Sequence, residues 1–263
     1  MLLEHIYIFI ILLSLLGGII IGIFGSGSGL ILMPTYFFAL QSFPIAQDMK
    51  MQMAITTTVL STSIALLPAL YKHYKNKNID SYIIRRISPG MIIGAFLAII
   101  FLNIMPSSIL KPLFGIIVIM LSIWFIAYKS ESDTTKWSIN NKRNLTFTAI
   151  ISFLWNSLGV GAFTVPYLIK CQLNIRKAIG ATAVMSIILG CIMGSMLTVT
   201  GYFYIGISYN HIGFLNTTFL LLTIPTLMAG SYIGSSISIY IKQDYLKVSL
   251  AILTFIVGVI MLL

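Results

Sequence analysis

The scarcity of charge along the chain is the feature that most limits how it folds. Of its 263 residues, 58% are hydrophobic and only 8% are charged, whereas soluble domains carry about 25% charged residues. A bilayer core needs about 20 consecutive apolar residues per helix. We therefore predict an all-α polytopic membrane protein with hydrophobic segments at 6–23, 30–40, 52–71, 83–103, 108–128, 144–157, 162–170, 178–200, 214–240 and 247–263.

The net charge of +10 would suggest nucleic acid as a partner only if the chain were soluble. In a membrane protein Lys and Arg mark the cytoplasmic loops, so we expect a lipid bilayer and no nucleic acid. Cys171 and Cys191 match no metal spacing, and we expect neither a metal nor a cofactor. The first segment lacks the positive residues that begin a cleaved signal peptide, which favours a retained membrane segment.

The two halves of the chain resemble each other, which predicts an internal repeat. We predict one membrane repeat over 1–128, a second over 144–263, and a cytoplasmic linker loop over 129–143. Matching positions recur in the same order at offsets of 132, 125 and 136 residues: Gly27, Gly29 and Pro34 with Gly159, Gly161 and Pro166; Thr57 and Ser61 with Thr182 and Ser186; Pro89 and Gly94 with Pro225 and Gly230.

The positions of Lys and Arg predict how the segments cross the membrane. If the two broken segments, 6–40 and 144–170, each cross once, the positive residues divide almost equally between the two sides. If each enters and returns as a hairpin, fourteen fall on one side and only Lys50 and Lys111 on the other. The positive-inside rule favours the hairpins. Each repeat then has a broken helical hairpin plus three transmembrane helices, and the second repeat is inverted, as in secondary transporters.

Small and polar residues break both hydrophobic runs, and we predict that these breaks bind the substrate. They comprise Gly25, Ser26, Gly27, Ser28 and Gly29 in the first half, and Asn156, Ser157, Gly159 and Gly161 in the second. Unwound backbone at membrane depth is tolerated only where protein buries it or it lines a watery cavity. The N-terminus of the helix that restarts near Leu30 favours an anion. Both breaks are expected to face one small anion, with Pro34 and Pro166 shaping the helices.

Hydroxyl side chains on the helices that follow the breaks extend the predicted site. Thr57 and Ser61 are one helical turn apart, as are Thr182 and Ser186, so we predict that these four line the path. The alternative is that the small residues serve helix packing and that Ser and Thr bond back to their own helices. Trp155 adjoins the second break and could form a wall of the site.

The sequence carries no motif that indicates an enzyme. No strand–helix–strand unit surrounds Gly25–Gly29 and no Gly-Lys-Ser/Thr follows it, which argues against a dinucleotide fingerprint and a phosphate loop. Neither H-E-x-x-H nor G-x-S-x-G occurs. The six acids and three histidines fall in predicted loops or at segment ends, so no intramembrane proton relay is expected.

The broken segments and the helices after them resemble the TauE/SafE family of sulfite exporters. The matching elements are GSGSGLILMP (25–34) with AITTTVLSTS (54–63), and NSLGVGAFTVP (156–166) with AIGATAVMS (178–186). The resemblance covers nearly the whole chain. It implies a multi-pass transporter of small sulfur-containing anions, such as sulfite or organosulfonates, in the cytoplasmic membrane of a bacterium.

Export and uptake of an anion differ in what they require. An anion that leaves a negative-inside cell moves downhill by about 2.3 kcal/mol per charge per 100 mV, so an exporter or facilitator needs no coupling ion. Uptake would need one, such as Na⁺. An uptake carrier or channel for another small solute is the alternative function. A structural membrane protein would not need paired polar breaks. No pattern in the sequence indicates an oligomeric state.

Overall fold

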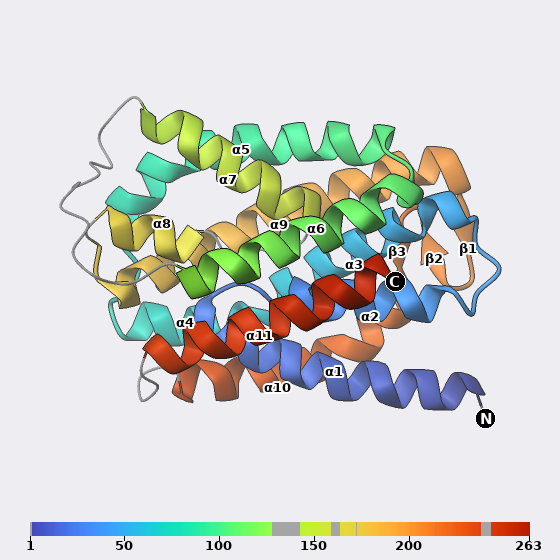
Figure 1. The fold of residues 1–263 in the computed structure, drawn as a ribbon, viewed down its shortest axis with the longest axis horizontal. Coiled ribbons are helices and arrows are strands. Elements are labelled where there is room, and N and C mark those ends of the chain that lie inside the picture. Colours follow the sequence, from blue (N-terminus) through green and yellow to red (C-terminus); the bar gives the residue numbers. More distant parts are fainter. Residues whose placement is uncertain (1, 128–142, 159–163, 172, 238–242) are drawn as a thin grey trace.

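The structure, a computed structural model, describes residues 2–127, 143–158, 164–171, 173–237 and 243–263. Most of them form helices that run roughly along one axis of an elongated bundle (Figure 1). In chain order these are α1 (Leu2–Phe24), α2 (Gly29–Leu40), α3 (Lys50–Ala65), α4 (Leu67–Lys75), α5 (Ser81–Ile104), α6 (Ser107–Ala127), α7 (Arg143–Leu158), α8 (Thr164–Lys170), α9 (Ile175–Ile205), α10 (Thr217–Ile237) and α11 (Gln243–Leu262), with a 3-10 turn at Gln47–Met49.

Several helices are long and apolar enough to cross a membrane, which confirms a predominantly helical, multi-pass membrane protein. Within the described residues five segments meet this criterion: Glu4–Phe24, Gln47–Lys75, Ser81–Ile104, Arg176–Ile205 and Thr217–Ile237. Shorter apolar helices cover Gly29–Leu40, Ser107–Ile123 and Ala251–Leu262. Large apolar side chains such as Phe9, Ile100 and Leu221 are exposed on the outer faces of the bundle, where lipid would cover them.

A small antiparallel sheet follows α9, in the order β1 (Ile207–Ser208), β2 (His211–Ile212) and β3 (Leu215–Asn216). Ile212 pairs with Ile207 on one side and Leu215 on the other. The all-α prediction omitted this sheet, because strands of two residues have too few positions to display a period of two. The helix predicted to begin at residue 214 therefore begins at Thr217.

Both broken segments return on themselves as hairpins. α2 runs back beside α1, so that a Cβ added at Gly17 would lie 3.4 Å from the Leu32 side chain. α8 returns toward the start of α7, where the Tyr167 hydroxyl donates a hydrogen bond to the side-chain oxygen of Asn144. Leu263 lies at the same end of the bundle as the N-terminus, the α2–α3 connection and the sheet (Figure 1).

The opposite end of the bundle collects the connections that carry most of the positive charge. Lys177 at the start of α9 forms a 2.9 Å ion pair with Asp80, which precedes α5. Lys72 on α4 donates a 2.9 Å hydrogen bond to the carbonyl oxygen of Tyr232 near the end of α10. The loops at 72–86 and 170–177 therefore share one end, as the charge distribution predicts. Residues 128–142 and 238–242 lie outside the described part of the chain.

The main helix pairs join the first half of the chain to the second. α1 packs along α10 and α7 packs along α5, while α6 pairs with α11 and α3 with α9. Glycines allow close approach: a Cβ at Gly22 on α1 would lie 2.3 Å from the carbonyl oxygen of Ser231, and one at Gly94 on α5 would lie 2.2 Å from that of Ala149. Membrane helices associate through such small residues because lipid provides no hydrophobic drive between them.

The short helix α2 is enclosed by the rest of the protein, which places the first break inside the bundle. Every residue of α2 except Phe38 is buried. The Tyr36 hydroxyl is 2.7 Å from the Thr223 hydroxyl of α10, and the Tyr36 ring stacks on that of Phe219. A helix of this kind does not need to span the bilayer, since protein rather than lipid surrounds it.

Candidate functional site

The backbone of the first break adopts a shape that only glycine allows without strain. Gly25 and Gly27 have φ angles of 70° and 98°, a region that costs other residues about 1–2 kcal/mol. The Gly25 amide still donates to the Ile21 carbonyl at 2.8 Å. Its own carbonyl accepts a 3.0 Å hydrogen bond from the Ser186 hydroxyl of α9, so the break is tied to the second half of the chain.

The restart of the helix differs from the sequence-based expectation. We predicted an anion-binding N-terminus near Leu30, but Leu30 donates to the Gly27 carbonyl at 3.1 Å, and Ile31 and Leu32 both donate to the Ser28 carbonyl. The positive end of the α2 dipole thus lies at the Gly27–Gly29 backbone. Ser28 precedes the helix without capping it by its side chain, and that side chain contributes to a cavity.

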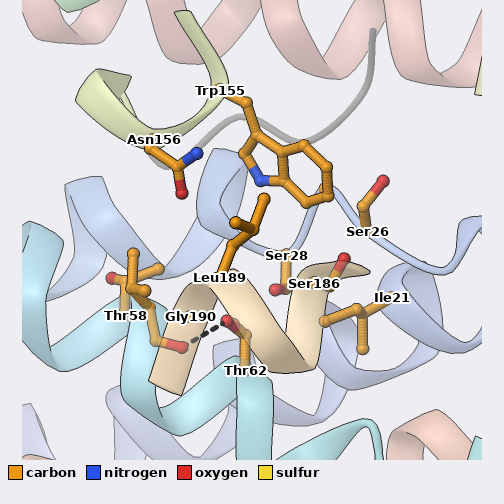
Figure 2. A pocket seen from close by; sticks show the side chains of 12 residues that line it. Ile21, Ser26, Ser28, Thr58, Thr62, Trp155, Asn156, Ser186, Leu189 and Gly190 are labelled. Atoms are coloured by element: carbon orange, nitrogen blue, oxygen red, sulfur yellow. Dashed lines mark hydrogen bonds between the residues drawn. The ribbon is translucent and has the colours of Figure 1, made fainter. Parts of the chain in front are cut away.

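A cavity of about 30 Å³ lies where the first break meets α3, α7 and α9 (Figure 2). One water needs roughly 10–15 Å³, so the space suits a ligand of very few heavy atoms. The lining residues come from both halves of the chain: Ile21, Ser26, Gly27, Ser28, Thr58, Val59, Thr62, Trp155, Asn156, Ser186, Leu189 and Gly190.

Five of the predicted site residues meet at this cavity, namely Ser26, Gly27, Ser28, Asn156 and Ser186. The juxtaposition of both breaks and α9 is thus present, and Trp155, expected as a wall, also lines the space. Gly25 does not line the cavity, but it is hydrogen-bonded to Ser186, which does. Gly29 is the buried first residue of α2 and does not line the cavity either. Gly159 and Gly161 lie outside the described residues. Pro34 lies within α2 and Pro166 within α8.

The other predicted hydroxyls lie elsewhere. Ser157 donates back to the Phe153 carbonyl and Thr182 to the Ala178 carbonyl, as the alternative interpretation expected. The Thr57 hydroxyl accepts a 3.0 Å hydrogen bond from the amide of Asn216 in β3. Ser61 is fully buried and absent from the lining. A role of these four residues in substrate binding remains a prediction.

The hydroxyl side chains that α3 presents to the cavity each lie one position after the predicted Thr57 and Ser61. Thr58 and Thr62, one turn apart, line the space, because one residue rotates the side chain about 100° around the helix axis. The Thr58 hydroxyl is buried and has no hydrogen-bond partner in the described structure. Buried polar groups normally have partners, so this atom favours a ligand. The six hydroxyls of residues 56–63 were visible in the sequence, but not which pair faced inward.

Asn156 brings an oriented amide to the cavity. Its Nδ2 donates to both the carbonyl oxygen and the hydroxyl of Ser152, at 2.8 and 2.9 Å. The carbonyl oxygen can only accept, which fixes the amide orientation. In Figure 2 the amide oxygen points toward the part of the cavity lined by Thr58 and Leu189.

Every described residue that lines the cavity is uncharged. The described charges gather toward the ends of the bundle, as in the Lys177–Asp80 pair. There the hydrogen bond from Lys177 holds the pKa of the Asp80 carboxyl below its ordinary value. Among the described residues no group of three or more His, Cys, Asp or Glu side chains could hold a metal ion.

Comparison with known proteins identifies relatives over the whole length of the chain. The model for the family described as "Sulfite exporter TauE/SafE" matches residues 10–261. A probable membrane transporter protein of Methanocaldococcus jannaschii is 28% identical over 275 aligned positions, covering 99% of this chain and 98% of the relative. One of Haemophilus influenzae is 25% identical over 182 positions, covering 68% and 69%. One of Bacillus subtilis is 22% identical, covering 96% of each chain. No solved structure matches.

Proposed function

The chain belongs to the sulfite exporter TauE/SafE family, and from that premise we propose that it is a secondary transporter that exports or facilitates a small anion, sulfite or an organosulfonate. Its relatives are named as membrane transporters rather than enzymes. The direction follows from electrostatics, since an anion leaves a negative-inside bacterial cell downhill without a coupling ion.

The observation that carries this proposal is the cavity itself. It joins the glycine-containing break, with the positive end of the α2 dipole, to Thr58, whose buried hydroxyl has no partner among the described residues. Anions bind at helix N-termini because amides and the dipole favour negative charge there, and a hydroxyl adds a donor. The small volume suits sulfite better than a larger organosulfonate.

We propose further that the halves are inverted repeats that move against each other in alternating access. The pairing of the helices supports this. In the two repeats α1 corresponds to α7 and α5 to α10, so the α1–α10 pair becomes the α7–α5 pair when the repeats are exchanged. The pairs α3–α9 and α6–α11 each join two corresponding helices and are unchanged by the exchange. A two-fold relation between repeats produces that pattern. The cavity lies between the repeats, where such a motion would open it alternately to either side.

Flux in proteoliposomes tests the proposal. The purified protein should transport radiolabelled sulfite at a rate that saturates with sulfite concentration. When the vesicles are loaded with sulfite, an imposed membrane potential that is negative inside should accelerate sulfite efflux. Gly27→Leu, which fills the break, should abolish flux while the protein still inserts; Gly206→Ala, outside the cavity, is the matched control. Absence of sulfite and sulfonate flux would overturn the proposal, and non-saturable flux would indicate a channel.

A further inference from the structure

The cavity presents hydrogen-bond acceptors as well as donors to its ligand. The Asn156 side-chain amide donates both of its protons to Ser152. The amide oxygen is therefore the atom that it presents to a ligand. The Ser186 hydroxyl donates to the carbonyls of Gly25 and Thr182, and the Thr62 hydroxyl to that of Val59. Each of these hydroxyls therefore presents lone pairs to the ligand. The Thr58 hydroxyl is buried and has no partner among the described residues, so its proton is available to the ligand.

Acceptors beside a fully deprotonated oxyanion would repel it. An acceptor in a buried site is satisfied only by a ligand that carries a donor. An oxyanion with one acidic proton left supplies such a donor, an X–OH group, and keeps other oxygens to accept from Thr58. A sulfonate has no acidic proton on its sulfur oxygens and cannot match this arrangement, so the inference narrows the proposed substrate from sulfite or an organosulfonate to sulfite.

The charge of the site points the same way. All the described lining residues are neutral, and residues 159–163, Gly-Val-Gly-Ala-Phe, carry no charge in the sequence. Lys177 lies nine residues before Ser186 on α9, about 13 Å along the helix, and is paired with Asp80. The α2 dipole supplies the equivalent of about half a positive charge. That balances part of one negative charge, whereas a second would be buried without compensation.

We propose that the protein carries its substrate as a singly protonated, singly charged oxyanion, hydrogensulfite in the case of sulfite. The X–OH group donates to the Asn156 amide oxygen, and the charged oxygens accept from Thr58 and face the break near Ser28. This inference rests on the proposed anion transport and states which ionic form is bound.

The pH dependence of flux tests the inference. At fixed total sulfite, flux should be constant below the second pKa of sulfite and fall about tenfold for each pH unit above it. The titratable side chains on the lining helices, including Tyr36, Lys50, Arg176, Lys177 and Cys191, all lie outside the lining. Flux that rises with the doubly charged form, or that requires Na⁺ at the acceptor oxygens, would overturn the inference while leaving anion transport intact.

A variant pair separates the role of the amide from the fold. Asn156→Leu removes the acceptor and should lower sulfite affinity at least tenfold. Thr148→Val on the same helix, where the hydroxyl bonds back to the Asn144 carbonyl and does not line the cavity, should keep the wild-type pH profile. If Asn156→Leu fails to fold, competition in the wild-type protein decides: methanesulfonate, a single charge without an acidic proton, should compete poorly. Competition as strong as that of hydrogensulfite would overturn the inference.

Discussion

The hydroxyl of Ser186 on α9 lies 3.0 Å from the carbonyl oxygen of Gly25 and donates a hydrogen bond to it. This contact joins the first break to a helix of the second half, and both residues adjoin the cavity. The contact gives the Gly25 carbonyl a hydrogen-bond partner inside the bundle. The shape of the break therefore depends on a residue 161 positions away in the sequence.

We predict that Ser186→Ala lowers both stability and sulfite affinity. Loss of a buried hydrogen bond costs about 1 kcal/mol, more where the partner stays unsatisfied. Thr198→Val is the control, since that hydroxyl bonds within α9 to the Gly194 carbonyl and does not line the cavity. Melting temperature in detergent and the KM of flux measure the two effects. Equal effects of the two substitutions on KM would contradict a role of Ser186 in holding the break.

Alanine substitutions at positive-φ glycines should separate backbone cost from steric cost. Gly206 has φ 65° and no atom within 4 Å of an added Cβ, so Gly206→Ala should cost about 1–3 kcal/mol from the backbone alone and leave flux intact. Gly25 has a similar φ, but its Cβ would lie 2.7 Å from the Ile179 carbonyl oxygen. Gly25→Ala should therefore destabilise more and abolish flux. Unfolding in mild denaturant and flux assays measure both; wild-type flux in Gly25→Ala would place the site elsewhere.

Two adjacent threonines on α3 should respond in opposite ways to removal of the hydroxyl. Thr58→Val removes a buried hydroxyl that has no partner in the described part of the chain, so it should keep or raise stability while weakening substrate binding. Thr57→Val breaks the bond to the Asn216 amide and should cost about 1 kcal/mol of stability. Substrate-induced thermal stabilisation measures binding in each variant. If only Thr57→Val weakens binding, the face predicted from the sequence is the correct one.

The Asp80–Lys177 ion pair should make a small, acid-sensitive contribution to stability. Because the pKa of Asp80 in the folded state lies below its ordinary value, the contribution is present above the unfolded pKa. It is lost as the pH falls through the folded pKa. The side chains are 26% and 47% exposed, so the expected size is at most about 1 kcal/mol and decreases with salt.

Asp80→Asn isolates the charge of that pair. The Asp80 side chain also accepts from the Tyr82 amide at 3.1 Å as the N-cap of α5, and asparagine caps equally well. The variant should melt slightly lower than the wild type at neutral pH and at the same temperature in acid. Asp80→Ala loses the cap as well and should remain less stable at both pH values. A constant difference between Asp80→Asn and the wild type across the pH range would contradict the electrostatic explanation.

Much of the architecture could be predicted from local properties of the sequence. Hydrophobic runs predicted α1, α5 and α9, and the Lys and Arg positions predicted which loops share an end, as the Lys177–Asp80 pair now shows for two of them. The two-residue strands near Gly206 and Gly213 lacked a recognisable period. In the candidate site, Ser28 and Asn156 were predicted because each lies in a cluster of small and polar residues that interrupts an apolar run.

The sequence by itself determined that the chain is a helical membrane protein with two breaks, because hydrophobicity, charge and glycine content act over a few neighbouring residues. Only the tertiary structure decided which side chains the breaks meet. Rotation of α3 by one residue separates Thr58 from Thr57, and such a rotation depends on contacts with α9 and β3 rather than on spacing. The orientation of the Asn156 amide likewise depends on its hydrogen bonds to Ser152.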